Sequence, residues 1–230
     1  MTTPNAALYQ QRLQKFIEQV TLYPVSCEKL ACGRTDEEWL DAVLAGGARI
    51  VQLRDKVSED RAFFAKAQIF RRKTAEAGAL FIVNNRLDIA LLAGADGIHL
   101  GNSDLPAPEV RRLAPDLLIG VSANTREQAA SAQVRGASYY NIGPLFPTAT
   151  KAGLTSFLGD AAIPAFSAAS GLPFTVMGGI KLEHVPRLTA LGASRIAVVT
   201  ALTRAENIEE ETRRWIAAIN QKKVTGRKQK

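Results

Sequence analysis

Short apolar runs and longer amphipathic stretches follow one another along the whole chain. The short runs are rich in Val, Ile, Leu, Phe and Tyr, as buried strands are, and the longer stretches carry apolar residues at helical spacing. The predicted strands cover residues 21–25, 48–53, 80–83, 96–100, 117–121, 138–142, 174–177 and 195–199. The predicted helices cover residues 7–20, 35–45, 58–77, 86–93, 107–113, 125–135, 161–169, 182–191 and 208–219. Eight strands that are each followed by a helix predict an α/β protein, a single (β/α)8 TIM barrel with an extra N-terminal helix.

Residues at the predicted helix ends agree with this pattern. Thr35 and Glu38 have the spacing of a capping box, and Ser58 is placed to open the long helix that follows the second strand. Gly94 closes a short helix, as a residue that readily adopts positive φ does. No linker rich in Pro, Gly or Ser divides the chain. The predicted organisation is a leading helix packed on the barrel, the barrel itself and a basic disordered tail, at residues 1–20, 21–220 and 221–230.

The positive charge of the chain is concentrated at its end. The formal net charge is +7, and five basic residues lie in the last ten positions, namely Lys222, Lys223, Arg227, Lys228 and Lys230. Without these five the charge is 7 − 5 = +2, which is ordinary for a globular protein. The charge therefore predicts a solvated tail and no nucleic-acid partner, a prediction that a gel shift at physiological salt can check.

Length and composition place the protein in a broad class. A chain of 230 residues with 47% hydrophobic residues can bury one large core. Its start shows no signal peptide, and no apolar stretch approaches the length of a membrane span. Cys27 and Cys32 match neither a redox nor a zinc spacing, so we expect reduced thiols and a cytoplasmic protein without a membrane partner. The sequence leaves open whether a homo-oligomer forms.

Polar side chains follow two neighbouring predicted strands in the stretch 81–104. Asn84 and Asn85 come after one strand, and Asn102 and Asp104 after the next. The carboxyl ends of parallel strands meet at one face of a barrel, so an amide and a carboxylate there can hold a hard cation through oxygen. Two capped turns would place the same residues, and these residues alone do not decide between the two interpretations.

Alternation along residues 49–56 sends Gln52, Arg54 and Lys56 to one side of the second strand, which we predict to be the barrel side. Cations are costly to bury unless an anion compensates them, so a substrate phosphate or an internal carboxylate is expected nearby. Ion pairing within the protein is the alternative interpretation.

Three later segments also have the composition of phosphate sites. The loop 143–156 offers two hydroxyls and an ammonium at Thr148, Thr150 and Lys151 without a nearby acidic residue, and a solvated surface loop is the alternative. Gly178 and its neighbour Gly179 follow the seventh strand, and the turn 199–200 follows the eighth. Backbone N–H groups after these two strands commonly bind phosphate in TIM barrels. The mouth of the barrel is therefore expected to hold two phosphorylated groups.

Six motifs in this order resemble the thiamine phosphate synthase family. They are QLRDK at 52–56, VNNRLDIALLAGADGIHLGNSD at 83–104, IGVSANT at 119–125, GPLFPTATK at 143–151, MGGI at 177–180 and AVVTAL at 197–202. Together they extend over most of the chain. The resemblance implies a transferase of thiamine biosynthesis that joins a pyrimidine methyl diphosphate to a thiazole phosphate, plain or carboxylated, and releases pyrophosphate.

The resemblance also assigns roles to residues of this chain. Catalytic roles fall on Arg54, Lys56, Ser122 and Lys151. Substrate contacts fall on Gln52, Arg54, Lys56, Asn84, Ser122, Thr148, Thr150, Lys151, Gly178, Val199 and Thr200. The expected cofactor is Mg²⁺, with Asn85 and Asp104 as its protein ligands, and the partners are small-molecule substrates. Mg²⁺ commonly binds diphosphates through only one or two protein groups.

The chain departs from the family pattern at three positions. Asn85 stands where the family has Asp, Asn102 where it has Gln, and Thr200 where it has Ser. The loss of a charge at Asn85 motivates one alternative, a non-catalytic phosphate-binding barrel. A second alternative is the related thiazole tautomerase, which uses a histidine at the position of Asn124. The two histidines of the chain lie elsewhere, and His99 is predicted to be a hydrogen-bonded structural residue.

Overall fold

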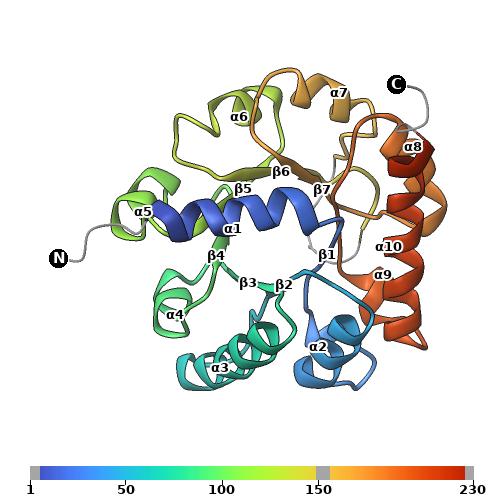
Figure 1. The fold of residues 1–230 in the computed structure, drawn as a ribbon. Helices are drawn as coiled ribbons and strands as arrows, with labels where there is room; N and C mark the ends of the chain where they lie inside the picture. The colour runs from blue at the N-terminus through green and yellow to red at the C-terminus, as the bar shows by residue number, and fades with distance from the viewer. Residues whose placement is uncertain (1–5, 149–155, 226–230) are drawn as a thin grey trace.

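Eight parallel strands form the centre of the molecule (Figure 1). The structure is a computed structural model that describes residues 6–148 and 156–225. The strands are β1 Leu22–Pro24, β2 Ile50–Leu53, β3 Leu80–Asn84, β4 Gly97–Leu100, β5 Leu118–Ala123, β6 Tyr139–Ile142, β7 Phe174–Val176 and β8 Ile196–Val198. Strands β2 to β8 each pair with their sequence neighbours, and β1 pairs with β8. A bridge between Val25 and Gln52 joins β1 to β2, so the predicted (β/α)8 TIM barrel is confirmed.

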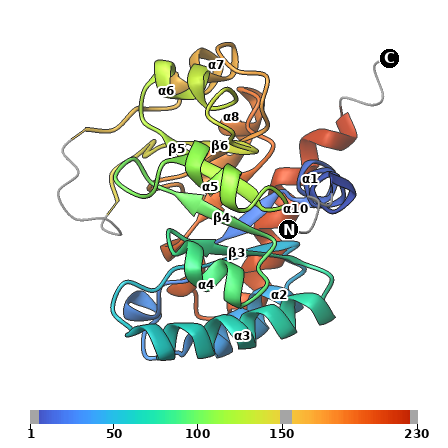
Figure 2. The same ribbon diagram turned by 90° about the vertical axis from the view of Figure 1, so that its left-hand side faces the viewer.

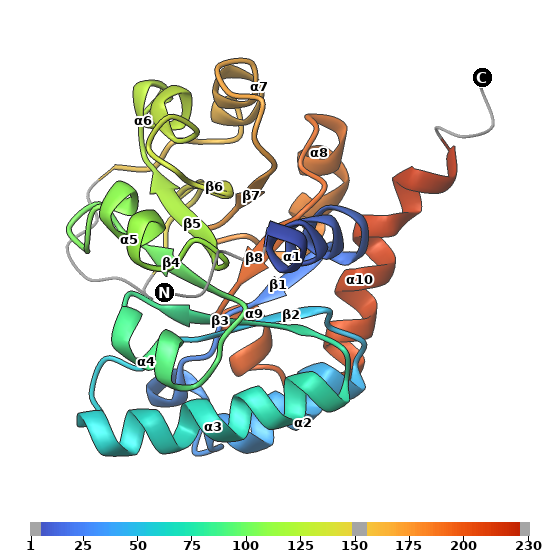
Figure 3. The same ribbon diagram turned by 60° about the vertical axis from the view of Figure 1, so that its left-hand side comes forward.

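The helices lie around the strands (Figures 2 and 3). They are α1 Ala6–Gln19, α2 Asp36–Ala45, α3 Asp60–Glu76, α4 Leu87–Leu92, α5 Ala107–Leu113, α6 Arg126–Ser131, α7 Ala162–Ser167, α8 Val185–Ala190, α9 Thr200–Thr203 and α10 Ile208–Thr225. The 3-10 turn η1 Glu28–Leu30 and the short helix α9 were not predicted. The 3-10 turn η2 Leu182–His184 forms the start of the predicted helix 182–191. None of the helices within the described ranges is long and apolar enough to cross a membrane.

Two helix ends differ from the prediction. Ser58 does not cap α3, because its hydroxyl donates to Asp55 Oδ2 at 2.6 Å and its backbone N–H to Asp55 Oδ1 at 2.9 Å. The chain therefore makes a turn before the helix begins at Asp60. At the other end of the chain α10 continues to Thr225, so the predicted tail boundary at residue 221 falls within this helix. The predicted capping box of Thr35 and Glu38 is present at the start of α2.

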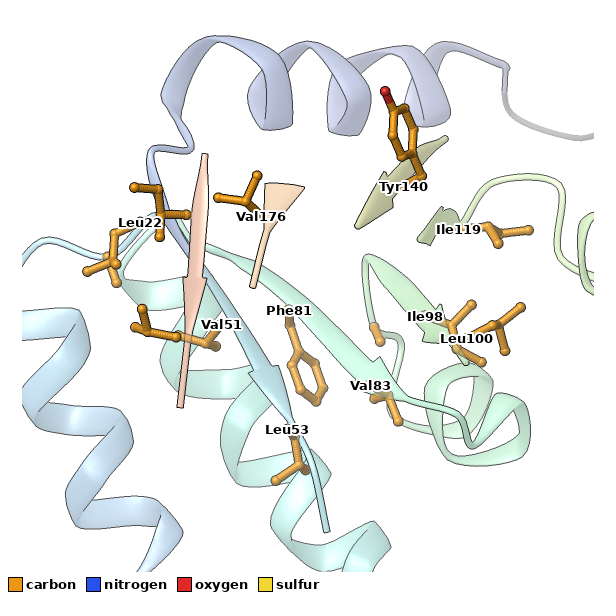
Figure 4. Close-up of a cluster of buried hydrophobic side chains, with 14 of the residues drawn as sticks. Leu22, Val51, Leu53, Phe81, Val83, Ile98, Leu100, Ile119, Tyr140 and Val176 are labelled. Atoms are coloured by element: carbon orange, nitrogen blue, oxygen red, sulfur yellow. The ribbon is translucent and has the colours of Figure 1, made fainter. Parts of the chain in front are cut away.

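The core has two layers that follow from the alternation of side chains along the strands. Between the strands and the helices lies a large apolar layer, part of which Figure 4 shows with Val51 and Leu53 of β2. Inside the barrel, Ile50 packs with aromatic residues of other strands. Helix α1 covers one end of the barrel, where Phe16 stacks on Tyr139 with ring centroids 4.5 Å apart. The opposite end, where the strands stop, remains available for a site.

Candidate active site

A cavity of about 1090 Å³ opens at the carboxyl ends of the strands. Each strand contributes a lining residue: Tyr23, Gln52, Asn84, His99, Ser122, Asn141, Thr175 and Val198. The loops that follow the strands supply the rest of the wall. This volume is at the upper end of the range for pockets that hold drug-sized molecules, so two small ligands fit together.

The structure brings most of the predicted site residues to this cavity. Those that line it are Gln52, Arg54, Lys56, Asn84, Asp104, Ser122, Thr148, Gly178, Val199 and Thr200. Asn85 is not in the lining, although it contacts a residue that is. Thr150 and Lys151 lie outside the described residues, so their predicted roles stay predictions.

The second strand delivers an amide and two cations to the cavity wall, as its alternation predicts. Gln52 is buried, and its Oε1 accepts a hydrogen bond from Asn84 Nδ2 at 2.9 Å. Arg54 is held by its backbone N–H, which donates to Ser26 Oγ at 3.1 Å, and its guanidinium contacts Cys27 Sγ at 3.7 Å. No carboxylate among the described residues forms an ion pair with Arg54, so for this residue an anionic ligand is favoured over internal pairing.

Asn85 and Asp104 lie together beside the cavity. Asn85 has a left-handed backbone with φ of 53°, a conformation that Asn tolerates better than most residues. Its Nδ2 donates to Asp104 Oδ1 at 3.3 Å, and its Oδ1 is buried without a hydrogen-bond partner within the described part of the chain. Asp104 Oδ2 also accepts from the backbone N–H of Gly101 at 2.7 Å. The amide nitrogen of Asn85 faces the carboxylate, while its unpartnered oxygen and the carboxylate of Asp104 are oxygen donors of the kind that Mg²⁺ takes.

Two consecutive glycines shape another side of the cavity. Gly178 and Gly179 have φ values of 105° and 61°, which side chains rarely adopt. A Cβ on Gly178 would lie 2.6 Å from Pro144 Cα, and one on Gly179 would lie 2.2 Å from the carbonyl oxygen of Pro147. The backbone N–H of Phe146 donates to the carbonyl of Gly178 at 2.9 Å, so the loop that leads to Thr148 is fixed to this turn.

The backbone N–H groups of Gly178 and Gly179 have no acceptor among the described residues. Together with Val199 and Thr200 of the neighbouring strand end, they line the same cavity. Free N–H groups after the seventh and eighth strands are suited to a phosphate group.

Ser122 and His99 meet at the floor of the cavity. The prediction placed Ser122 after the fifth strand, but β5 extends through Ala123, so Ser122 belongs to the strand and pairs in register with Asn141. His99 Nε2 lies 3.3 Å from Ser122 Oγ. Burial lowers the pKa of His99 to about 4, against the attraction of the Asp104 charge, so the imidazole is neutral at pH 7.

Four further lining residues were not assigned to a ligand from the sequence. Asn124 Oδ1 accepts from Asn102, and its Nδ2 donates to the carbonyl of Gly143, so this amide ties together the loops after three strands. Lys181 and Arg204 bring additional positive charge to the wall. In the sequence, only the position of Lys181 directly after the MGGI motif indicated that it belongs to the site. Nothing in the sequence indicated this for Arg204.

An acidic cluster outside the cavity already holds a lysine ammonium. Glu28, Asp36 and Asp55 approach one another closely enough to hold a metal ion. Lys66 forms ion pairs with all three carboxylates, at 2.9 Å from Asp55 and 3.3 Å from Asp36. The ammonium therefore takes the place that a cation would have, and this cluster is separate from the predicted site of Asn85 and Asp104.

The fold and the cavity define a (β/α)8-barrel protein whose mouth is lined by Arg54 and Lys56 after β2 and by the glycine turn after β7. A family model described as thiamine monophosphate synthase matches residues 22–202. The chain belongs to the thiamine-phosphate synthase family, a family of transferases of thiamine biosynthesis.

Individual relatives agree with this assignment. The thiamine-phosphate synthase of Shouchella clausii is 37% identical over 201 residues, which cover 87% of this chain and 96% of the relative. The thiamine-phosphate synthase of Moorella thermoacetica is 40% identical over 197 residues, which cover 85% of this chain and 94% of the relative. A solved structure of thiamine phosphate pyrophosphorylase from Pyrococcus furiosus superposes with a TM-score of 0.82 at 29% identity, over 88% of this chain and 96% of that chain.

Proposed function

We propose that the protein forms thiamine phosphate from 4-amino-2-methyl-5-pyrimidinylmethyl diphosphate and a thiazole phosphate, and that pyrophosphate is released. The observation that carries this proposal is one cavity with two separate groups of anion-binding elements. Arg54 and Lys56 line one part of it, and the turn at Gly178 and Gly179 lines another. Two phosphorylated substrates can therefore bind with their heterocycles between the two phosphate sites. We further propose that the enzyme works in the cytoplasm.

In the proposed reaction the bond between the pyrimidine methylene carbon and the diphosphate oxygen breaks, and the electron pair leaves with the diphosphate. The thiazole nitrogen then forms the new C–N bond to the methylene carbon. Arg54 and Lys56, together with Lys151, hold the diphosphate as negative charge develops on its leaving oxygen. Gln52 and Asn84 orient the pyrimidine, and Ser122 lies across the floor from them. This fixed geometry holds the thiazole nitrogen in line with the methylene carbon.

We propose that Asn85 and Asp104 hold a Mg²⁺ ion. When bound, the ion supplies positive charge that neutralises the diphosphate leaving group. Asn85 Oδ1 and the Asp104 carboxylate are the protein oxygens available for it. The protein contributes a single negative charge, so the diphosphate itself must supply much of the affinity.

The test is pyrophosphate release by the purified protein with both substrates and Mg²⁺, with detection of thiamine phosphate. Release that requires both substrates supports the synthase. Release from the pyrimidine diphosphate alone would indicate a hydrolase. Binding of both substrates without turnover would favour the non-catalytic phosphate-binding barrel. Isomerisation of the thiazole without the pyrimidine would favour the tautomerase.

A further inference from the structure

A chain of hydrogen bonds crosses the floor of the cavity and links residues of six strands. At its first end Asn84 Nδ2 donates to Gln52 Oε1 at 2.9 Å, and Gln52 Nε2 donates to Tyr23 Oη at 3.0 Å. Tyr23 Oη and Tyr139 Oη lie 2.9 Å apart. Gln52 and both tyrosines are buried, so each of these polar groups depends on the others for its hydrogen bonds.

The chain continues from Tyr139 to the other side of the floor. Tyr139 Oη lies 3.4 Å from His99 Nδ1, and His99 Nε2 lies 3.3 Å from Ser122 Oγ. Burial raises the pKa of Tyr139 well above its ordinary value, so its hydroxyl keeps its proton at neutral pH. Both nitrogens of His99 face hydroxyl oxygens, and a neutral imidazole has one N–H donor and one acceptor nitrogen for these two contacts.

Beyond Gln52 two directions are open, because either tyrosine hydroxyl could donate to the other and the imidazole could carry its proton on either nitrogen. One of them continues the direction of the donor at the first end. Tyr23 accepts a hydrogen bond from Gln52, and its single proton is therefore available for Tyr139. Tyr139 then uses its own proton for His99 Nδ1. A neutral imidazole that accepts at Nδ1 carries its proton on Nε2, and this proton is donated to Ser122 Oγ. In this direction both tyrosine hydroxyls and the imidazole N–H have acceptors.

We propose that Tyr23, Tyr139 and His99 are positioning residues that give this chain of hydrogen bonds one fixed direction. Two groups that face the ligand are set as a result. Ser122 accepts from the chain, so its own proton is free to donate into the cavity. Asn84 uses its amide N–H within the chain, so its carbonyl oxygen is free to accept from the ligand.

An acceptor on one side and a donor on the other match a heterocycle that carries an amino group and a ring nitrogen. The inference rests on the proposed function for the identity of this ring, the aminopyrimidine. It adds a specificity rule that the reaction alone does not require. A ring with an oxo group in place of the amino group would bring two carbonyl oxygens together at Asn84, and it should be rejected.

The direction of the hydrogen bonds can be measured without substrate or turnover. The protein contains two histidines, so ¹⁵N-histidine NMR of the ligand-free full-length protein shows the ring nitrogens of two imidazoles, which a His184→Gln variant assigns. At pH 7 we expect His99 to carry its proton on Nε2 and to show an unprotonated Nδ1. Tyr139→Phe should change the populations of the two tautomers. Tyr140→Phe is the matched control, because its hydroxyl contacts the carbonyl of Phe166 in the outer layer.

A His99 protonated on Nδ1 would show that the hydrogen bonds are donated in the opposite direction. A mixture of tautomers would show that they have no fixed direction. Either result would overturn the inference. Because this measurement uses no substrate, it stands or falls independently of the synthase activity.

A kinetic measurement tests the consequence for specificity. The kcat/KM for the amino substrate is divided by that for its oxo analogue. We expect this ratio to be at least about a hundred in the unaltered protein and to fall at least about tenfold in Tyr23→Phe and Tyr139→Phe. Tyr140→Phe should keep it. A purely structural role would lower both values of kcat/KM equally and leave the ratio unchanged, which would contradict the inference.

Discussion

Asn85 Nδ2 lies 3.3 Å from Asp104 Oδ1, while Asn85 Oδ1 is buried with no partner among the described residues. The amide thus brings an oxygen to the predicted metal site but lacks the charge that the family's aspartate supplies. Affinity for hard cations depends on the charge of the ligands. The effect of Asn85 on the affinity for Mg²⁺ can be measured directly.

We predict that Asn85→Asp lowers the Mg²⁺ concentration for half-maximal pyrophosphate release several-fold, because it adds a second carboxylate. Asp104→Asn should remove most of the turnover. The asparagine keeps an oxygen that can accept from the N–H of Gly101, which holds the loop, and it gives up the charge and the bond from Asn85 Nδ2. A Mg²⁺ titration of the three proteins is the measurement. An unmoved midpoint in Asn85→Asp would show that position 85 is not a metal ligand.

Lys151 is predicted to stabilise the leaving diphosphate. Lys151→Ala should reduce kcat/KM by about ten to a thousandfold, the effect of removing one electrostatic stabiliser. Lys73→Ala is a suitable control, because Lys73 pairs with Asp41 and Glu37 on the helical surface. Steady-state kinetics of both variants provide the comparison. Equal activity of the two would place Lys151 outside the reaction.

Alanine substitutions at Gly179 and Gly94 distinguish the effect of backbone strain from the effect of steric crowding. Their φ values are 61° and 63°, so alanine meets a similar strain of about 1–2 kcal/mol at both. Only at Gly179 would the new Cβ collide with backbone, 2.2 Å from the Pro147 oxygen, whereas nothing lies within 4 Å at Gly94. Gly179→Ala should therefore lose more stability in urea unfolding and also raise KM for the thiazole phosphate. Equal losses in the two variants would show that the loop moves aside without cost.

The buried Asp36 predicts a pH effect on stability. Burial raises the pKa of Asp36 to about 6, against the attraction of Lys66. The folded state therefore binds the proton more tightly than the unfolded state. Protonation of Asp36 stabilises the folded state fully below about pH 4, and this stabilisation is lost as the pH rises through about 6. Between these values the free energy of unfolding should fall by about 1–3 kcal/mol more in the unaltered protein than in Asp36→Asn.

Urea unfolding at pH 4.5 and pH 7 measures this difference. Asp60→Asn serves as the control, since Asp60 also lies in the first turn of a helix but is exposed. If Asp36→Asn keeps the pH dependence of the unaltered protein, the carboxylate is not the group that titrates.

The sequence by itself determined the order of strands and helices and the residues that end at the mouth of the barrel. Strand and helix periods depend on neighbours a few residues apart, so local pattern is enough to find them. The side-chain alternation of β2 placed Gln52 and Arg54 on the barrel side, and the structure puts both in the cavity wall. The assignment of Ser122 came from motif resemblance, and that of Asp104 came from the polar residues that follow two neighbouring strands and then from the resemblance. Both residues line the same cavity.

Only the tertiary structure decided which polar groups meet. Ser58 has the features of a helix cap, yet its hydroxyl bonds to Asp55, whose carboxylate Lys66 also holds. Tyr23 and Tyr139 are 116 positions apart, and their hydroxyls lie 2.9 Å from one another. That contact exists because the barrel closes and both side chains point inward, where a buried hydroxyl must find a partner. No local pattern carries this information, because the distance between the two hydroxyls depends on how all eight strands are placed around the barrel.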